Sequence, residues 1–472
     1  MNEKAKTLLK NLNYTVSANF LVLGISVVLN LVVPKFIGVK EYSFWQLYVF
    51  YSSYVGFFHF GWLDGIYLKI GGAEYDELDK RNLGTQFWYL AISQTLFGLV
   101  IIIVGVVQNL GEYKSIILTF VALNLIITNG KVFSLYILQS TNRIKEYAQI
   151  SRGDRYIYLL GVGIYLLLHG QSFIPLIALD VFSKLIMLLW SLIKIKDILM
   201  VKKIAFKKII IEIFDNIKIG SNLMISNIAS MLILGISRMM VERQWSIETF
   251  GKLSFTLSIS NMFMTFINAV GIVMFPLLRR TKHDMLPRLY LCIREVFVPV
   301  TYSLLLLYTP VKMILNLWLP DYSESLTYMG ILFPMVIYEG RMALLVSTYL
   351  KTIRKEKLIL LSNIVTLVGS AILSTITIFI IKNIYITVIV IMLSLAFRCI
   401  FAEKQLLNVM NLDMDKEMVY ESILTSVFIM VNILTTQIFS FSIYLTIFGI
   451  YLFTHRNKIK YSSKELLSLM KN

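Results

Sequence analysis

Apolar runs of about twenty residues recur along the chain, separated by short polar stretches. A helix of that length, rising 1.5 Å per residue, crosses the roughly 30 Å hydrocarbon core of a bilayer. We expect about fourteen such helices, near residues 14–33, 42–67, 84–107, 115–137, 156–169, 173–193, 220–240, 250–275, 292–310, 325–349, 358–381, 384–402, 418–434 and 438–454. The pattern predicts an all-α, polytopic membrane protein.

The composition agrees with this class, since 57% of the 472 residues are hydrophobic and only 15% are charged. Lipid covers the apolar faces of such helices, so one continuous helical body replaces the several cores of a soluble chain this long. The first apolar segment ends in Val32-Val33-Pro34 instead of a small-residue cleavage site, so we interpret it as a retained helix. The two cysteines, Cys292 and Cys399, imply no disulfide framework and no metal site, and no cofactor is expected.

The formal net charge of +17 reflects the topology of the chain in the membrane. Lysine and arginine are concentrated in the loops expected on the cytosolic side, which is the positive-inside pattern of membrane proteins. The charge therefore indicates contact with anionic membrane lipids, and nucleic acid is not an expected partner. We expect a multi-pass protein of the bacterial plasma (inner) membrane with both termini in the cytosol.

The longest expected cytosolic connection covers residues 194–218 and carries seven lysines interleaved with apolar residues. This pattern is typical of an amphipathic helix lying on the inner leaflet, and a solvated basic loop is the alternative. The connection falls between the sixth and seventh expected spans. It therefore indicates a linker between two halves of the chain.

Local matches suggest that the two halves repeat. YSFWQL at residues 42–47 aligns with ETFGKL at 248–253, and TNRIKE at 141–146 resembles TIRKE at 352–356. Two six-helix units of the same orientation would be related by an axis along the membrane normal. We expect an N-terminal six-helix bundle at 1–193, a basic amphipathic linker at 194–219, a C-terminal six-helix bundle at 220–404, and two additional helices with a basic cytosolic tail at 405–472.

The expected arrangement of six, six and two helices, with the strings HFGWLDGIYLKIGG, ILQSTNRIKEYAQI and VMFPLLRR, resembles the polysaccharide-export branch of the multidrug/oligosaccharidyl-lipid/polysaccharide (MOP) superfamily, the Wzx-type flippases. The resemblance implies two bundles around a central cavity and alternating access. It also implies translocation of undecaprenyl-pyrophosphate-linked oligosaccharide to the outer leaflet for O-antigen, capsule or another surface polysaccharide. Polysaccharide polymerase and chain-length machinery are then possible partners.

A pyrophosphate-linked glycan needs a polar path through hydrocarbon, with cations for the pyrophosphate. Four cations are assigned to the interior of expected spans: Lys131, Lys184, Lys252 and Arg341. Asp180 lies four residues before Lys184, so these two are expected to form an ion pair. Glu339 and Arg341 lie on different helix faces, so each needs another partner, and Pro334 is expected to kink their helix.

Lys131, Lys252 and Arg341, together with Arg238 near the outer mouth, are therefore candidates for a substrate cavity, and interhelix ion pairs or snorkelling are the structural alternatives. Uncharged polar residues of related spans are candidates for contacts with sugar hydroxyls, although helix–helix hydrogen bonds explain them equally well. These residues are Asn19, Asn30, Asn222 and Asn227.

The stretch HFGWLDGIYLKIGG, residues 59–72, combines glycines with ionisable groups. Gly61 and Gly65 form a small-xxx-small face that lets another helix approach closely, and Gly71 with Gly72 is expected to end the helix. His59 and Asp64 are candidates for a coupling or gating site, as is Glu339, and structural roles are the alternative.

No phosphate-binding loop, zinc-protease motif or nucleophile elbow occurs, so we do not expect an enzyme. A membrane glycan polymerase or ligase is the alternative from another class, but the expected outer loops are short. A cation-coupled drug exporter of the multidrug and toxic compound extrusion (MATE) type is the alternative among transporters. The predicted excess of intramembrane cations favours an anionic substrate over that alternative.

Overall fold

The computed structural model describes residues 24–201 and 204–469, and within these ranges the chain is helical without any strand. Helix is present at every expected apolar segment, in the first of them from residue 24 onward. Among the described residues, nine helices are long and apolar enough to cross a membrane, and a tenth crossing results if the bent pair Pro320–Leu332 and Met335–Thr352 is one span. The number of fourteen spans and the internal repeat stay predictions.

The chain divides into two compact units. One contains residues 36–228, and the other combines residues 229–472 with the N-terminal segment, which is described from residue 24 to residue 35. We call them the N-terminal unit and the C-terminal unit. The domain boundaries expected at residues 193, 219 and 404 stay predictions.

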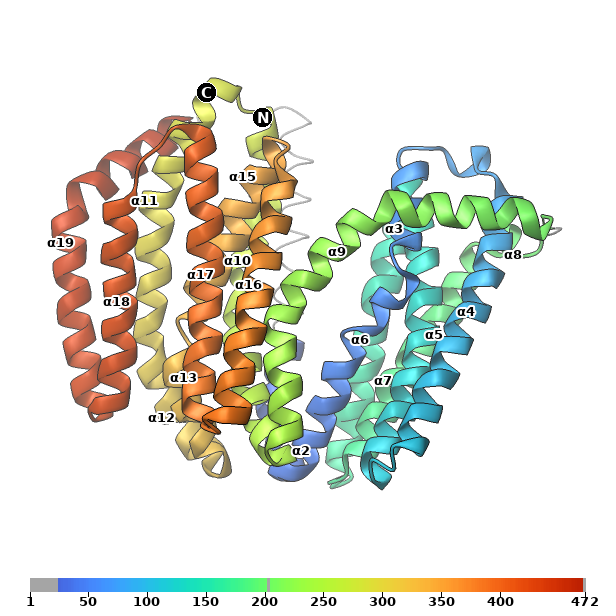
Figure 1. Cartoon of the computed structure of the whole chain (residues 1–472), viewed down its shortest axis with the longest axis horizontal. Helices are drawn as coiled ribbons and strands as arrows, with labels where there is room; N and C mark the ends of the chain where they lie inside the picture. Colours follow the sequence, from blue (N-terminus) through green and yellow to red (C-terminus); the bar gives the residue numbers. More distant parts are fainter. Residues whose placement is uncertain (1–23, 202–203, 470–472) are drawn as a thin grey trace. The chain divides into compact units, whose positions relative to one another are not determined.

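The N-terminal unit is a helical bundle (Figure 1). Its elements are most of α2 (Val33–Ser52), η2 (Val55–His59), α3 (Trp62–Ile70), η3 (Tyr75–Glu77), α4 (Lys80–Val107), α5 (Glu112–Ser140), α6 (Ile144–Leu167), α7 (Phe173–Lys194), α8 (Lys196–Leu199) and the first part of α9 (Phe206–Gln244). Helix α5 packs against α3, α4, α6 and α7, so it is the central helix of this unit.

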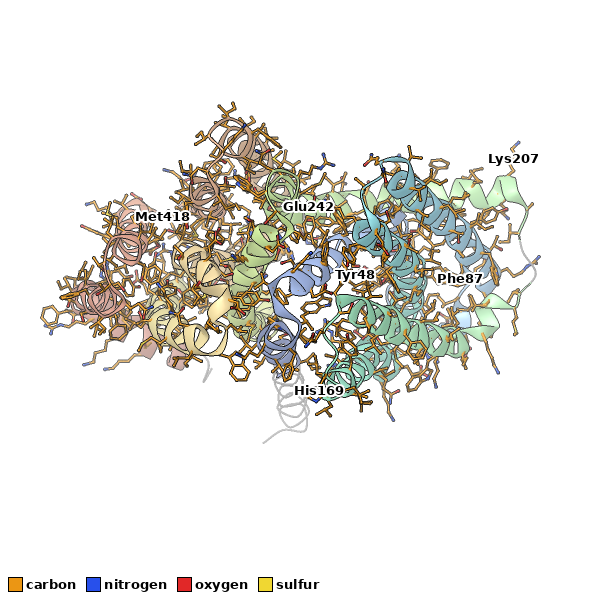
Figure 2. All side chains as sticks on the ribbon, turned by 90° about the horizontal axis from the view of Figure 1, so that it is seen from below. Tyr48, Phe87, His169, Lys207, Glu242 and Met418 are labelled. Atoms are coloured by element: carbon orange, nitrogen blue, oxygen red, sulfur yellow. The ribbon has the colours of Figure 1, made fainter. Side chains whose placement is uncertain are left out.

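The core of the N-terminal unit lies between α3, α4, α5 and the start of α9. Phe87 of α4 contacts Phe133 of α5 with ring centroids 5.3 Å apart. In α9, Ile209 and Ile213 are buried in the same core, whereas Lys207 is exposed. Figure 2 shows Phe87 among the helices and Lys207 pointing away from them. The start of α9 therefore packs Ile209 and Ile213 onto the unit, whereas Ile211 and Phe214 are exposed.

The expected continuous helix over 42–67 is broken between α2 and α3. Phe60 and Gly61 adopt the left-handed conformation, with φ of 51° and 84°, and this turns the chain before α3 begins. Side chains satisfy carbonyls freed by the break. Gln94 Nε2 donates to Phe58 O at 3.2 Å, and Asn129 Nδ2 donates to Val55 O at 3.0 Å.

Glycines bring α3 and α9 into backbone contact. A Cβ on Gly61 would lie 2.7 Å from Ser221 N, and a Cβ on Gly220 would lie 2.0 Å from Gly61 O. The prediction that the Gly61 and Gly65 face admits another helix is confirmed, and that helix is α9. Helix α3 ends at Ile70, directly before the two glycines expected to end it.

The C-terminal unit begins with η1 (Val28–Val32) and continues through the later part of α9. It then comprises α10 (Ile247–Arg280), η4 (His283–Met285), α11 (Leu286–Leu304), η5 (Leu305–Leu307), α12 (Tyr308–Trp318), η6 (Pro320–Tyr322), α13 (Ser323–Leu332), α14 (Met335–Arg341), η7 (Met342–Val346), α15 (Ser347–Thr352), α16 (Glu356–Thr375), η8 (Ile376–Ile380), α17 (Ile384–Met410), α18 (Asp415–Leu434) and α19 (Gln437–Leu469).

Helices α18 and α19 are integrated into this unit and lie beside α11 (Figure 1). Helix α19 packs against α11, and α18 packs against α13. Pro334 separates α13 from α14, and the two segments of this span are bent by 48°. The expected kink at Pro334 is therefore confirmed. It brings Glu339 and Arg341 onto a short helix, α14, which packs against α10, α11 and α17.

Candidate functional site

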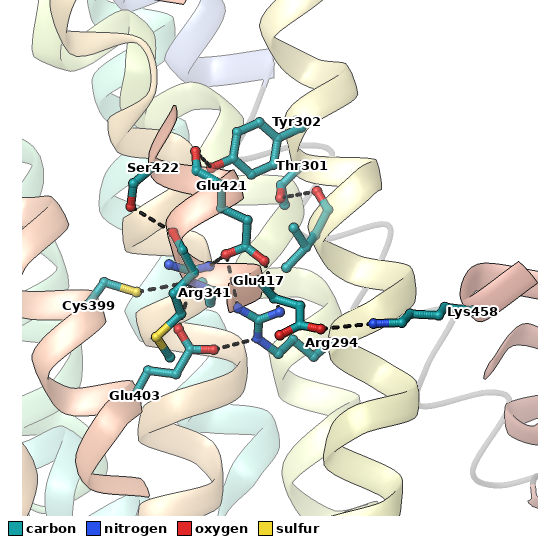
Figure 3. A network of polar contacts seen from close by, with 12 residues as sticks. Arg294, Thr301, Tyr302, Arg341, Cys399, Glu403, Glu417, Glu421, Ser422 and Lys458 are labelled. Carbon is teal, nitrogen blue, oxygen red and sulfur yellow. Dashed lines mark hydrogen bonds and ion pairs between the residues drawn. The ribbon is translucent and has the colours of Figure 1, made fainter. Parts of the chain in front are cut away.

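The most deeply buried arginine and glutamate side chains in the described part of the chain form a network in the C-terminal unit (Figure 3). It joins Arg294 of α11, Arg341 of α14, Glu403 of α17 and Glu421 of α18. Arg294 Nε lies 2.7 Å from Glu403 Oε1, and Arg294 Nη1 lies 2.9 Å from Glu421 Oε1. Arg341 Nε lies 3.2 Å from Glu403 Oε2, and Arg341 Nη1 pairs with Glu421 Oε2. Two cations and two anions make the network neutral.

Neutral side chains complete the network. Tyr290 Oη donates to Glu403 Oε1 at 2.7 Å, Tyr302 Oη donates to the backbone oxygen of Glu421 at 2.8 Å, and Arg341 Nε donates to Cys399 Sγ at 3.3 Å. Charges taken out of water are tolerated when they are paired and hydrogen-bonded, and loss of one partner leaves an uncompensated buried charge. The network thus fastens four helices together, including α18.

Arg341 is only 1% exposed, and both of its carboxylate partners are in place. Glu339, two residues earlier, pairs instead with Arg398 of α17, whose Nη1 also donates to Ser230 Oγ at 2.8 Å. The expectation that Glu339 and Arg341 need separate partners is confirmed. Whether Arg341 lines a substrate cavity stays a prediction.

Lys252 and Arg238 lie on adjacent helices of the C-terminal unit. Lys252 Nζ is 2.7 Å from Glu324 Oε2 of α13, and the two side chains are 22% and 39% exposed. Arg238 Nη2 donates to Ser254 Oγ of α10 at 2.9 Å, and its guanidinium lies over the ring of Phe250. The structure therefore links α9 to α10 through Arg238, and α10 to α13 through Lys252.

Lys131 lies on α5 in the N-terminal unit. Its Nζ is 2.5 Å from Asp154 Oδ2 of α6, and the two side chains are 9% and 11% exposed. Asn129, two residues earlier, is fully buried and also donates to Gln94 Oε1 of α4 at 2.8 Å. The polar face expected around Lys131 thus connects α5 to α4 and α6.

His59 and Asp64 flank the break between η2 and α3. His59 Nε2 lies 3.9 Å from Asp64 Oδ2, and His59 Nδ1 accepts a hydrogen bond from the Gly61 N–H at 3.1 Å. Tyr136 Oη of α5 donates to Asp64 Oδ1 at 3.3 Å. The structure brings this candidate pair together at a broken helix, and its role in coupling or gating stays a prediction.

Three of the candidate asparagines, Asn30, Asn222 and Asn227, belong to the described residues. Asn30 Nδ2 donates to the backbone oxygen of Ser26 at 2.8 Å. Asn222 and Asn227 are exposed on α9, and Asn19 lies outside the described residues. The expected i,i+4 pair of Asp180 and Lys184 is confirmed, with 2.6 Å between Lys184 Nζ and Asp180 Oδ2.

Several charged residues of these clusters were not singled out from the sequence. They are Asp154, Arg294, Glu324, Arg398, Glu403 and Glu421. Arg294, Arg398 and Glu421 lie inside expected apolar segments, and Glu403 lies one residue beyond the end of such a segment. A search for opposite charges near the ends of the expected helices would find these residues. With these partners, the cations Lys131, Lys252 and Arg341 each face an acidic group.

Comparison with known proteins places this arrangement in a structural class. No protein-family model matches the sequence, and no curated protein shows detectable sequence similarity to it. The solved structure titled "Lipid II flippase MurJ, inward closed conformation" matches with a TM-score of 0.65 and 11% identity, over 94% of this chain and 99% of that chain.

Two solved MATE structures match as well. An inward-facing multidrug resistance MATE transporter of the MOP superfamily has a TM-score of 0.59 and 12% identity, over 85% of this chain and 100% of that chain. A MATE protein in a straight conformation has a TM-score of 0.51 and 10% identity, over 85% of this chain and 96% of that chain. The chain therefore has the multi-pass helical fold of MOP-superfamily transporters.

Proposed function

We propose that this chain is a flippase that moves undecaprenyl-pyrophosphate-linked oligosaccharide units from the cytosolic to the outer leaflet by alternating access, for surface polysaccharide biosynthesis. The observation that carries the proposal is the match to a lipid II flippase over 94% of the chain. The expected arrangement of six, six and two helices and the local strings that resemble Wzx-type flippases point to the same class of lipid-linked substrate. A flippase of this kind needs paired polar groups inside its helices, and both units contain them.

Arg238 and Lys252 are the cations that we propose for first contact with the pyrophosphate. Both are partly exposed, so an anion reaches them without separating a fully buried ion pair. Arg341 is enclosed by Glu403 and Glu421, and a pyrophosphate would have to replace one of these carboxylates to bind it. Lys131 would likewise have to exchange its partner Asp154 for the pyrophosphate.

A MATE-like cation-coupled drug exporter is the second candidate. The two MATE matches favour it, and so do the acidic partners of Lys131, Lys252 and Arg341, which offset the cationic excess expected from the sequence. An organic cation would use these carboxylates where a pyrophosphate would use the basic groups. The two functions therefore differ in which member of each ion pair is needed for transport. A flippase would need the basic residue, and a drug exporter would need the acidic one.

The experiment that separates them is depletion of the protein in its native cell. Polyprenyl-linked oligosaccharide is then quantified on each face of the membrane, together with sensitivity to cationic dyes. We expect complete lipid-linked units to accumulate on the cytosolic face with unchanged dye tolerance. New dye sensitivity with normal glycan would establish the drug exporter, and complete units left unpolymerised on the outer face would indicate a polymerase or ligase.

Complementation with variants then tests the proposed contacts. Lys252→Gln and Arg238→Gln should each reduce export of lipid-linked units without loss of protein from the membrane. Lys382→Gln, at an exposed position before α17, is the matched control and should export normally. Normal export by both Lys252→Gln and Arg238→Gln would refute the assignment of these two residues.

A further inference from the structure

An open groove of about 580 Å³ runs between α17 and α18 on the surface of the C-terminal unit. Ile400 and Lys404 of α17 form one wall, and one side of α18 from Met418 to Met430 forms the other. Met418 is labelled in Figure 2. Val419, on the same wall, is 57% exposed. The groove is therefore a mainly apolar surface on helices that are apolar enough to span a membrane.

The hydroxyl groups in this groove are engaged within their own helix. Ser422 Oγ donates to Met418 O at 2.8 Å, and Ser426 Oγ donates to Ser422 O at 2.8 Å. A ligand therefore meets an apolar surface along α18, and the strongly polar group of the lining is the exposed Lys404 at one end. The groove combines a long apolar part with a terminal positive charge.

The length of the groove suits one lipid leaflet. Twelve residues separate Met418 from Met430, which corresponds to about 18 Å along a helix. Half of the hydrocarbon core measures about 15 Å. Lys404 lies at the end of the spans where the positive-inside pattern places the cytosol, and anionic phospholipids are enriched in the cytosolic leaflet.

We propose that this groove binds an anionic phospholipid of the cytosolic leaflet, with one acyl chain along α18 and the phosphate against the ammonium group of Lys404. Glu403 and Glu421, which hold the buried network, directly precede the groove residues Lys404 and Ser422 in sequence. The lipid would therefore pack against the outer side of the two helices that the network joins. The site rests on the membrane topology and is independent of which molecule is transported.

The test uses the full-length chain in nanodiscs of equal parts phosphatidylglycerol and phosphatidylcholine, followed by native mass spectrometry of the lipids retained in mild detergent. We expect one phosphatidylglycerol retained per chain. Lys404→Ala should lower this retention by about fivefold, the factor for losing one basic contact with an anionic headgroup. Ser426→Trp should abolish it by filling the groove.

Two control variants match these changes. Lys382→Ala removes an exposed lysine before the opposite end of α17, and Ile433→Trp adds the same bulk at an exposed position of α18 beyond the groove lining. Both should retain phosphatidylglycerol as the wild type does. Thermal unfolding of each variant verifies that it is folded. Lys404→Ala changes the charge and Ser426→Trp changes the volume of the groove, so the test remains possible if one of the two variants fails to fold.

Three results would overturn the proposal. Retention unchanged in both groove variants would mean that the lipid binds elsewhere. Equal retention of phosphatidylcholine would mean a nonselective lipid surface. Displacement of phosphatidylglycerol by added polyprenyl phosphate would assign the groove to the lipid-linked substrate. Because lipid retention is measured without transport, a failure here is distinguishable from a failure of the flippase assignment.

Discussion

A Cβ atom on Gly65 of α3 would lie 1.9 Å from the backbone oxygen of Asn216 on α9. No side chain fits at that distance, so the two helices touch backbone to backbone. Such contacts are a common way of packing helices in membranes, where close approach replaces the hydrophobic driving force. Gly65 is therefore required for the position of α9 in the N-terminal unit.

Gly65→Ala should destabilise the protein by about 1–3 kcal/mol, since the added methyl group forces α9 away from α3. The change is measured as a lower thermal unfolding midpoint in detergent. Gly163→Ala on α6 is the control, because a Cβ there meets nothing within 4 Å. It should be neutral or stabilising, as alanine favours helix over glycine. Equal effects of the two changes would contradict the close contact.

Features of one helix could be predicted from the sequence, because local spacing determines them. The Asp180–Lys184 pair, the glycine face of α3 and the kink at Pro334 are of this kind. Contacts between helices that are distant in sequence could not be predicted, because the hydrophobic pattern identifies the apolar face of each helix but not the helix that packs against it. Arg294 and Glu403 are 109 residues apart.

Because the sequence pattern does not identify neighbouring helices, the number of intramembrane cations without an acidic partner was overestimated. From the sequence, Lys131 and Arg341 lacked acidic partners, and the predicted excess of cations followed from that. In the structure Asp154, 23 residues from Lys131, and Glu421, 80 residues from Arg341, supply the opposite charges from other helices. Ion pairs across a bundle require its packing to be known, so pairing within one helix underestimates how many intramembrane charges are balanced.

Arg341 and Glu403 should depend on one another in stability. Arg341→Met or Glu403→Gln alone leaves an unbalanced charge in the buried network and should cost about 3–5 kcal/mol. The double variant leaves Arg294 with Glu421, a neutral pair, so its cost should be well below the sum of the two single costs. Unfolding by denaturant in detergent measures the three free energies.

Lys458→Met serves as the control for that cycle. It removes a cation from a pair with Glu417 in which Lys458 is 56% exposed, so it should cost less than about 1 kcal/mol. Additive costs for Arg341→Met and Glu403→Gln would show that the two side chains do not act as one network.

Variants of Lys131 and Asp154 can distinguish a structural role of this ion pair from a role in transport. Lys131→Met and Asp154→Asn should each lower stability, and the double variant should recover most of it because no unpaired charge remains. If Lys131 exchanges Asp154 for the pyrophosphate during transport, the double variant regains stability without regaining export of lipid-linked units. The measurement combines unfolding in detergent with the two-face assay of polyprenyl-linked glycan. Full recovery of export would limit Lys131 to a structural role.

Glu146, which precedes the expected span of α6, should make stability depend on acid pH. Its hydrogen bond from Arg143 holds the pKa of Glu146 below its usual range, and Lys194 Nζ lies 3.4 Å from Glu146 Oε1. A carboxyl group with a depressed folded-state pKa stabilises the fold above its unfolded pKa of about 4.3, and this stabilisation is lost as pH falls through the folded value.

Glu146→Gln should therefore lower the unfolding midpoint slightly at pH 7, and the gap to the wild type should close below about pH 4. The effect is small and weakens with salt because the Glu146 side chain is 24% exposed. Glu77→Gln removes an exposed carboxylate of η3 and is the control for the substitution itself, so its unfolding midpoint at pH 7 should stay close to that of the wild type. A gap for Glu146→Gln that stays constant down to pH 3 would mean that the ionised carboxylate does not stabilise this end of the N-terminal unit.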